Sequence, residues 1–151
     1  PTPPAGYNNA NASEPMPRVS PDGRWVAFTT DESGREEVVV QPFPGPGGRV
    51  QVSASGGSEP VWSRDSRRLY YRGDGHLMAA RLAAGSTFAI AARDTLFIDA
   101  YQGAPNPHSN YDAMPDGAHF LFLKAASEGS LIVVVNWRSV MRTRMVGSAA
   151  K

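Results

Sequence analysis

The 151-residue sequence contains no cysteine. This excludes a disulfide framework and every thiolate metal site, and it fits a reducing compartment as well as an oxidising one. The sequence also lacks an excess of charge of either sign, because 15 Lys and Arg face 14 Asp and Glu, for a formal net charge of +1. We therefore expect no strong field that would attract nucleic acid or an anionic membrane.

Long hydrophobic runs are missing as well. The longest apolar run, residues 131–135, is far shorter than the ~20 residues of a membrane-spanning helix, so we expect no membrane contact by this chain itself. No basic and then apolar leader opens the sequence. Because it begins at Pro1 and not at Met, we expect it to be a piece of a longer protein.

One short pattern occurs three times. "SPDGRWVAF" (20–28) returns in weaker form as "SRDSRRLYY" (63–71) and "MPDGAHFLF" (114–122), and the aspartates are 43 and 51 residues apart. This spacing brackets the period of ~40–50 residues that is typical of propeller blades, each a four-stranded sheet. Between the copies no long segment has a period of 3.6 residues, so the sequence indicates a mainly β fold.

The Pro-Asp-Gly element is typical of a hairpin turn. Proline sets φ at the first turn position, aspartate accepts a nearby backbone N–H, and glycine adopts a positive φ. The middle copy has Ser66 in place of glycine and keeps only the aspartate. We predict structural turns at Asp22, Gly23, Asp65, Asp116 and Gly117.

Both faces of the strand after each turn are largely apolar, so each sheet must be covered on both sides, as a blade between two neighbours is. The predicted strands are 16–20, 24–30, 36–42, 49–54, 60–63, 67–72, 76–82, 87–98, 110–113, 118–124 and 130–136. We therefore predict an all-β fold, a partial β-propeller of about two and a half to three four-stranded antiparallel blades.

The predicted organisation has three parts. Residues 1–13 are rich in Pro, Asn and Ala and indicate a flexible arm or linker. The partial propeller covers 14–137, with units at about 14–57, 58–108 and 109–137. Residues 138–151 form a basic tail, and the segment around 137–146 fits either a short amphipathic helix or a terminal strand.

The stretches "VSPDGRWVAF", "ESGREEVVVQPFPGPGGRVQVSASGGSEPVWSRD" and "NYDAMPDGAHFLFLK", followed by "LIVVVNW", resemble the TolB-like, WD-repeat-like β-propellers of bacteria. More narrowly, they resemble the C-terminal part of propellers attached to bacterial serine/threonine protein kinases. The resemblance implies a ring of about six blades, of which the N-terminal half is missing here. It also implies a periplasmic or other extracytoplasmic location. Kinase motifs are absent from the sequence.

The sequence gives little support for a catalytic site or a metal site. The sequence contains no Gly-x-Ser-x-Gly elbow, and its Ser residues lie in repeated turns. His76, His108 and His119 lack the close spacing of a zinc site. The acidic loops 30–34 and 72–76 fit simple turns better than calcium loops. We expect no catalytic residue, no cofactor and no metal, and we interpret the basic tail as a solvated end.

A binding face is expected where the loops at one end of the propeller converge, namely 31–35, 55–59, 73–75 and 99–109. Long loops are often functional, and the last of these is the longest. The alternative is that it merely connects to a missing neighbour. The candidate residues are Glu59, Asp74, Tyr101, Asn106 and His108, and the partner would be a protein or a small ligand.

Two functions remain open. The first is a non-enzymatic sensor or scaffold segment of a larger kinase-linked or envelope protein. The second is a propeller that gates a hydrolase or peptidase domain located outside this chain. In either case the open ends of an incomplete ring, behind which we place Trp25, Val26, Phe120 and Phe122, predict that the isolated chain self-associates.

Overall fold

The computed structural model describes residues 17–45, 47–101 and 109–123 and the backbone of 124 and 130–134. Every regular element in these ranges is a strand, and the strands form three antiparallel sheets of four, four and three strands. The first sheet holds β1 (Arg18–Val19), β2 (Trp25–Thr30), β3 (Glu37–Pro42) and β4 (Val50–Gln51). The second holds β5 (Ser58–Trp62), β6 (Arg68–Gly73), β7 (His76–Leu82) and β8 (Ile90–Ile98). The third holds β9 (Tyr111–Ala113), β10 (Phe120–Lys124) and β11 (Ser130–Val134).

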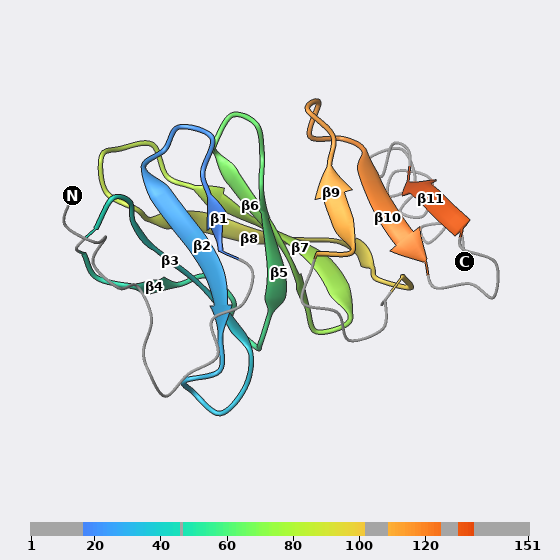
Figure 1. Cartoon of the computed structure of the whole chain (residues 1–151), viewed down its shortest axis with the longest axis horizontal. Coiled ribbons are helices and arrows are strands. Elements are labelled where there is room, and N and C mark those ends of the chain that lie inside the picture. Colours follow the sequence, from blue (N-terminus) through green and yellow to red (C-terminus); the bar gives the residue numbers. More distant parts are fainter. Residues whose placement is uncertain (1–16, 46, 102–108, 125–129, 135–151) are drawn as a thin grey trace, which may run out of the picture.

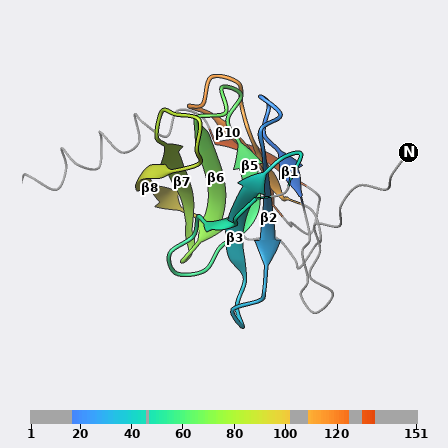
Figure 2. The same ribbon diagram turned by 90° about the vertical axis from the view of Figure 1, so that its left-hand side faces the viewer.

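Each sheet is a meander in which neighbours in sequence are neighbours in space, as in a propeller blade. The first strands lie side by side, with β5 in contact with both β1 and β9 (Figure 1). Seen from the side, the second sheet runs outward from β5 to β8 (Figure 2). The protein is therefore a partial β-propeller with three blades in the described part of the chain, and the predicted fold class is confirmed.

The predicted strands agree closely with the observed ones. The range 76–82 coincides with β7, and 24–30 and 36–42 each begin one residue before β2 and β3. The main differences are the shorter strands β1 and β4, at the edges of the first sheet. The predicted arm at 1–13 and the possible C-terminal helix lie outside the described residues.

The turn between the first and second strand of each blade is built in the same way. In each, the aspartate Oδ1 accepts the backbone N–H two residues later, at 3.2 Å for Asp22, 3.0 Å for Asp65 and 2.9 Å for Asp116. The residue after each aspartate has a positive φ of 72° at Gly23, 56° at Ser66 and 62° at Gly117. The middle blade thus keeps the same turn although Ser66, unlike glycine, has a Cβ that makes a positive φ energetically unfavourable.

Two apolar clusters fill the joints between the blades. Ala27, Leu69 and Tyr71 belong to the cluster between the first and second blades, and Trp25 packs against it. Tyr70, on the other face of β6, belongs to the cluster between the second and third blades, together with Phe120 and Phe122. Successive residues of each strand therefore serve two different joints, as period-two alternation requires.

The placement of Trp25, Phe120 and Phe122 at open ends was wrong. Both phenylalanines are fully buried between blades, and the ring of Trp25 lies 5.3 Å from that of Phe88 in the second blade. Val26 is also buried, in a small cluster within the first blade. The error arose because the repeat shows which residues share a face but not which neighbour that face meets. On β10 the face away from the second blade instead carries Leu121 and Leu123, and Leu123 is 51% exposed.

We predict that Asp65→Ala lowers the free energy of unfolding by about 1 kcal/mol at neutral pH, because the turn loses its side-chain acceptor. The Ser63 hydroxyl, and after it the Arg67 N–H, lower the pKa of Asp65. A carboxylate with a lowered pKa stabilises the fold above its ordinary pKa, and this stabilisation is lost as the pH falls through the folded pKa. Urea denaturation of both proteins over a range of pH measures the effect.

The matched control is Arg64→Ala, which changes the neighbouring residue. Arg64 is exposed, and within the described ranges its side chain makes no hydrogen bond or ion pair. An equal loss of stability in both variants would contradict the turn as described.

Candidate functional site

A groove runs along the inner edge of the three blades. It has a volume of about 360 Å³. Its walls come from the first strand of every blade and from the residues next to these strands, namely Arg18, Val19, Pro21, Val61, Trp62, Ser109, Tyr111 and Asp112. The groove therefore combines apolar walls with one cation and one carboxylate.

Side chains that cross from one blade to the preceding one fix the inner strands. The Trp62 indole Nε1 of β5 donates a hydrogen bond to the Arg18 carbonyl of β1 at 2.8 Å. The Tyr111 hydroxyl of β9 donates to the Glu59 carbonyl of β5, also at 2.8 Å. Each first strand has a neighbouring strand on one side only in the described part of the sheets. The aromatic donors therefore tie the inner strand of one blade to the inner strand of the preceding blade, and they hold the groove walls in place.

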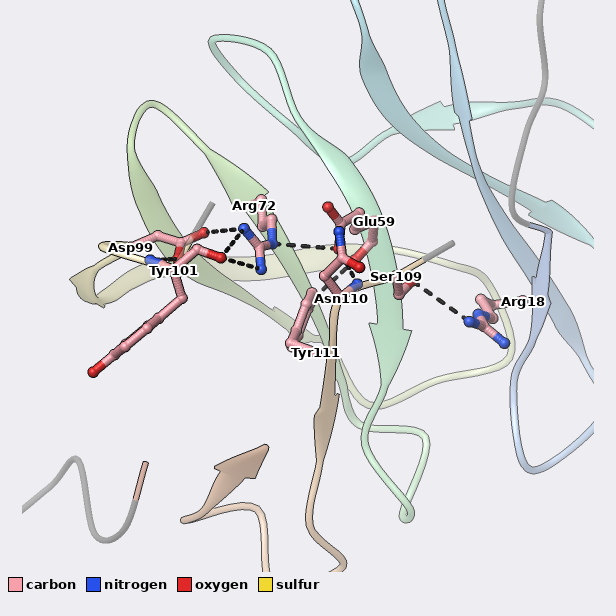
Figure 3. A network of polar contacts seen from close by, with 8 residues as sticks. All are labelled: Arg18, Glu59, Arg72, Asp99, Tyr101, Ser109, Asn110 and Tyr111. Atoms are coloured by element: carbon pink, nitrogen blue, oxygen red, sulfur yellow. Dashed lines mark hydrogen bonds and ion pairs between the residues drawn. The ribbon is translucent and has the colours of Figure 1, made fainter. Parts of the chain in front are cut away.

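Beside the groove, at the loop end, a buried guanidinium organises a polar network (Figure 3). The side chain of Arg72, on β6, is only 8% exposed. Its Nη1 lies 2.8 Å from Asp99 Oδ2, and its Nε lies 3.3 Å from Glu59 Oε2. The Arg72 Nη1 and Nη2 groups also donate to the Tyr101 carbonyl, at 3.3 and 3.4 Å. One buried cation thus balances two carboxylates, whose combined charge exceeds its own.

The network joins distant parts of the chain. Glu59 Oε2 accepts the backbone N–H of Asn110 at 2.7 Å, which ties β5 to the start of the third blade. Asp99 Oδ1 accepts the N–H of Tyr101 at 3.0 Å, and the Asp99 N–H donates to the Gly75 carbonyl at 2.8 Å. The chain is therefore anchored to one cluster on both sides of residues 102–108.

Aromatic rings enclose the cation. The Arg72 guanidinium carbon lies 5.5 Å from the ring centre of Tyr111 and 5.7 Å from that of Phe122. The Tyr101 ring lies 5.1 Å from that of Phe122 and extends this aromatic layer. A buried arginine loses much hydration, and nearby ring faces and carboxylates offset part of that loss.

The structure brings together two of the five predicted binding residues. Glu59 and Tyr101 meet at Arg72, although Tyr101 contributes its carbonyl to the network and its ring to the core. Asp74 lies in the β6–β7 hairpin and is exposed, and within the described part of the chain the neighbouring Gly75 links this hairpin to the network. Asn106 and His108 lie outside the described residues.

Sequence reasoning missed Arg72 and Asp99. A detectable signal was present, because "LYYRG" places an arginine inside an otherwise apolar strand. A strand that is buried on both faces forces such an arginine to find acidic partners. The identity of those partners depends on contacts between residues 59, 72 and 99 that only the folded chain creates.

The described residues lack two features that would indicate other kinds of site. No group of three or more His, Asp or Glu side chains there is arranged to hold a metal ion. No helix long and apolar enough to cross a membrane occurs in these ranges.

Comparison with known proteins gives a distant structural likeness. No family model and no curated protein matches the chain. Among solved structures, a putative 6-phosphogluconolactonase from Bacteroides fragilis is similar at 14% sequence identity with a TM-score of 0.48. The match covers 81% of this chain and 37% of that protein, so the chain spans little more than a third of its length. The fold class rests on the three antiparallel sheets themselves.

The position of Glu59 changes its acidity. Burial raises the pKa of the Glu59 carboxyl above its ordinary value of 4.5, against the opposing effects of the Asn110 N–H and the Arg72 charge. Glu59 also has a positive φ of 53°, an uncommon conformation for a residue with a side chain. Glu59 thus combines a strained backbone with a carboxylate whose loss of hydration exceeds the stabilisation by its neighbours, and it lies beside the groove.

We predict that Glu59→Gln becomes more stable relative to the wild type as the pH rises from about 4 to about 7. An acid whose folded pKa is raised stabilises the fold below its unfolded pKa, and this contribution is lost as the pH rises through the folded pKa. The glutamine carbonyl can still accept the Asn110 N–H. Urea midpoints of both proteins across this range measure the difference, with Asp74→Asn, which changes an exposed carboxylate, as the control. A pH-independent difference for Glu59→Gln would show that burial does not control this carboxyl.

Proposed function

We propose that this chain is a non-enzymatic recognition segment of a TolB-like bacterial propeller, and that it binds a protein or small ligand along the inner-strand groove. The observation that carries the proposal is the groove itself. Three separate blades build its walls, and inter-blade hydrogen bonds from Trp62 and Tyr111 fix them. A surface that is already ordered loses little conformational freedom when it binds a partner.

The composition of the groove suits a polypeptide or a polar small molecule better than nucleic acid. Arg18 and Asp112 place one charge of each sign beside apolar walls. The nearly neutral chain supplies no basic surface field of the kind that binds phosphate backbones. The volume of about 360 Å³ lies within the range of about 300–1,000 Å³ that is typical of ligand sites.

The resemblance to kinase-attached propellers supports a sensor role within a larger extracytoplasmic or envelope protein. The competing role is the gating of a hydrolase domain elsewhere in the parent protein. The coding sequence on both sides of this segment discriminates the two. An upstream kinase and membrane helix supports the sensor, and a downstream α/β-hydrolase domain supports the gate.

We predict that a photo-crosslinking amino acid at Val19, which is 48% exposed in the groove, captures a partner from an extract of the source organism. The same group at Thr95, exposed on the outer strand β8, should not capture it. The captured partner is then purified, and its affinity is measured by calorimetry. Val19→Lys should weaken binding by about tenfold, or ~1.4 kcal/mol, while Thr95→Lys should leave it unchanged. Equal capture from both positions, or equal affinity of both lysine variants, would contradict the groove as the site.

We also propose that the isolated chain self-associates through the open face of β10. Leu121 lies in register with Ala27 and Tyr70, which both face the next blade in the joints described above. A second copy would continue this same type of packing, because Leu121 and the half-exposed Leu123 meet no following blade in the described residues.

Light scattering coupled to size exclusion tests this proposal at a concentration of about 10 µM, where an interface worth ~8 kcal/mol would be largely formed. We expect a dimer or larger species for the wild type and a shift toward monomer for Leu123→Lys. Thr95→Lys is the control for added charge on an exposed strand position. A wild-type monomer, or no change with Leu123→Lys, would overturn the proposal.

A further inference from the structure

A second pocket lies at the opposite end of the blades, where the turns between first and second strands are found. It occupies about 230 Å³ between the second and third blades. Its lining includes Arg68, Tyr70, Arg81, Asp94 and Gly117. This pocket shares no lining residue with the inner-strand groove, so it is independent of the function proposed above.

The repeat shows which side chain distinguishes this pocket from the corresponding place in the first joint. Arg68 follows the turn of the second blade at the position that Trp25 occupies in the first. In the joint between the first and second blades, the Trp25 ring packs against Phe88 at 5.3 Å. In the next joint the corresponding position holds the guanidinium of Arg68, which lines the pocket and can bind an oxyanion there.

The guanidinium of Arg68 has no direct polar partner in the described part of the chain. Its side chain is only partly exposed, and within the described ranges it makes no hydrogen bond or ion pair. The carboxylate of Asp65 is near enough to interact with Arg68 through space, but its hydrogen bonds go to Ser63 and to the Arg67 N–H. A partly buried cation with no direct partner favours an anion that reaches it.

The other charges of the pocket balance each other. Arg81 Nε lies 2.7 Å from Asp94 Oδ2, so this pair contributes no net charge. The lining therefore carries a net positive charge that comes from Arg68. By contrast, Arg72 is also a buried arginine, but two carboxylates already occupy its guanidinium.

Gly117 keeps the pocket open beside the cation. Its φ of +62° belongs to the third-blade turn, and a Cβ on this residue would lie 3.5 Å from Arg68 Nη1 and 3.3 Å from the Tyr70 hydroxyl. Any side chain here would extend into the space next to the guanidinium. The turn therefore brings bare backbone to the place where a small ligand would sit.

We propose that this pocket binds a compact oxyanion, a carboxylate or a phosphate group, through the guanidinium of Arg68. The planar fork of arginine matches two oxygens of either group. The volume of about 230 Å³ is below the range of about 300–1,000 Å³ found for drug-sized ligands. The pocket thus takes the charged end of a small molecule and not a nucleotide or a peptide segment.

Nuclear magnetic resonance of the whole chain tests the proposal, with the Arg68 side-chain N–H signal as the reporter. Inorganic phosphate is titrated in one experiment and acetate in another, at constant ionic strength with chloride. We expect saturable shifts of the Arg68 signal with at least one of the two anions. Saturation by phosphate alone assigns the site to phosphate groups, by acetate alone to carboxylates, and by both to oxyanions in general.

Two variants make the test specific, and backbone amide signals around the pocket report binding in them. Arg68→Met should weaken binding at least about tenfold, whereas Arg64→Met, which removes an exposed arginine of the same turn, should leave it unchanged. Arg68→Lys keeps the positive charge and serves as the second variant if Arg68→Met does not fold. It should bind more weakly than the wild type, because lysine lacks the paired N–H donors of the guanidinium. The proposal is overturned if neither anion saturates, if chloride competes equally, or if Arg68→Lys binds as tightly as the wild type.

Discussion

The packing of one sheet against the next is the interaction on which this structure depends. Each second strand is apolar on both faces, so no blade can be stable in water on its own. Tyr70 and Tyr71 show this directly, because these adjacent residues of β6 are both buried and serve opposite joints. The loops, the inner-strand groove and the pocket at Arg68 take their positions from the stacking of the blades.

Polar interactions between the blades lie at the edges of the apolar clusters. Both joints have an aromatic hydrogen-bond donor, and the second joint also has a buried arginine. Near the inner edge, aromatic donors on Trp62 and Tyr111 satisfy carbonyls of the preceding blade. At the loop end of the second joint, Arg72 adds a buried charge that two carboxylates surround. Such a network stabilises little relative to apolar packing, but it fixes geometry, because each of its members would be costly to leave unpaired. The inner-strand groove lies directly beside it.

Local patterns in the sequence predicted most of the fold. The alternation of apolar residues and the Asp-centred turns depend on near neighbours, which explains why β7 and the three turns could be placed in advance. The candidate site was harder to predict from the sequence than the fold. Glu59 and Tyr101 were named from loop position alone, whereas Arg72 and Asp99 acquire their roles from contacts across the folded chain. The assignment of Trp25 and Phe120 to open ends failed because the direction in which blades stack is a property of three-dimensional handedness and is not encoded in the repeat period.

The crossing hydrogen bonds of the inner strands bear on how the chain folds during synthesis. The Arg18 carbonyl finds its donor 44 residues later at Trp62, and the Glu59 carbonyl finds its donor 52 residues later at Tyr111. Ribosomes add ~5–20 residues per second, so each blade emerges several seconds before the residue that completes its inner edge. The inner edge of a blade is therefore complete only after the next blade has been synthesised. The hydrogen bonds between blades then form in order from the N-terminus toward the C-terminus, and each one stabilises the blade that was made earlier.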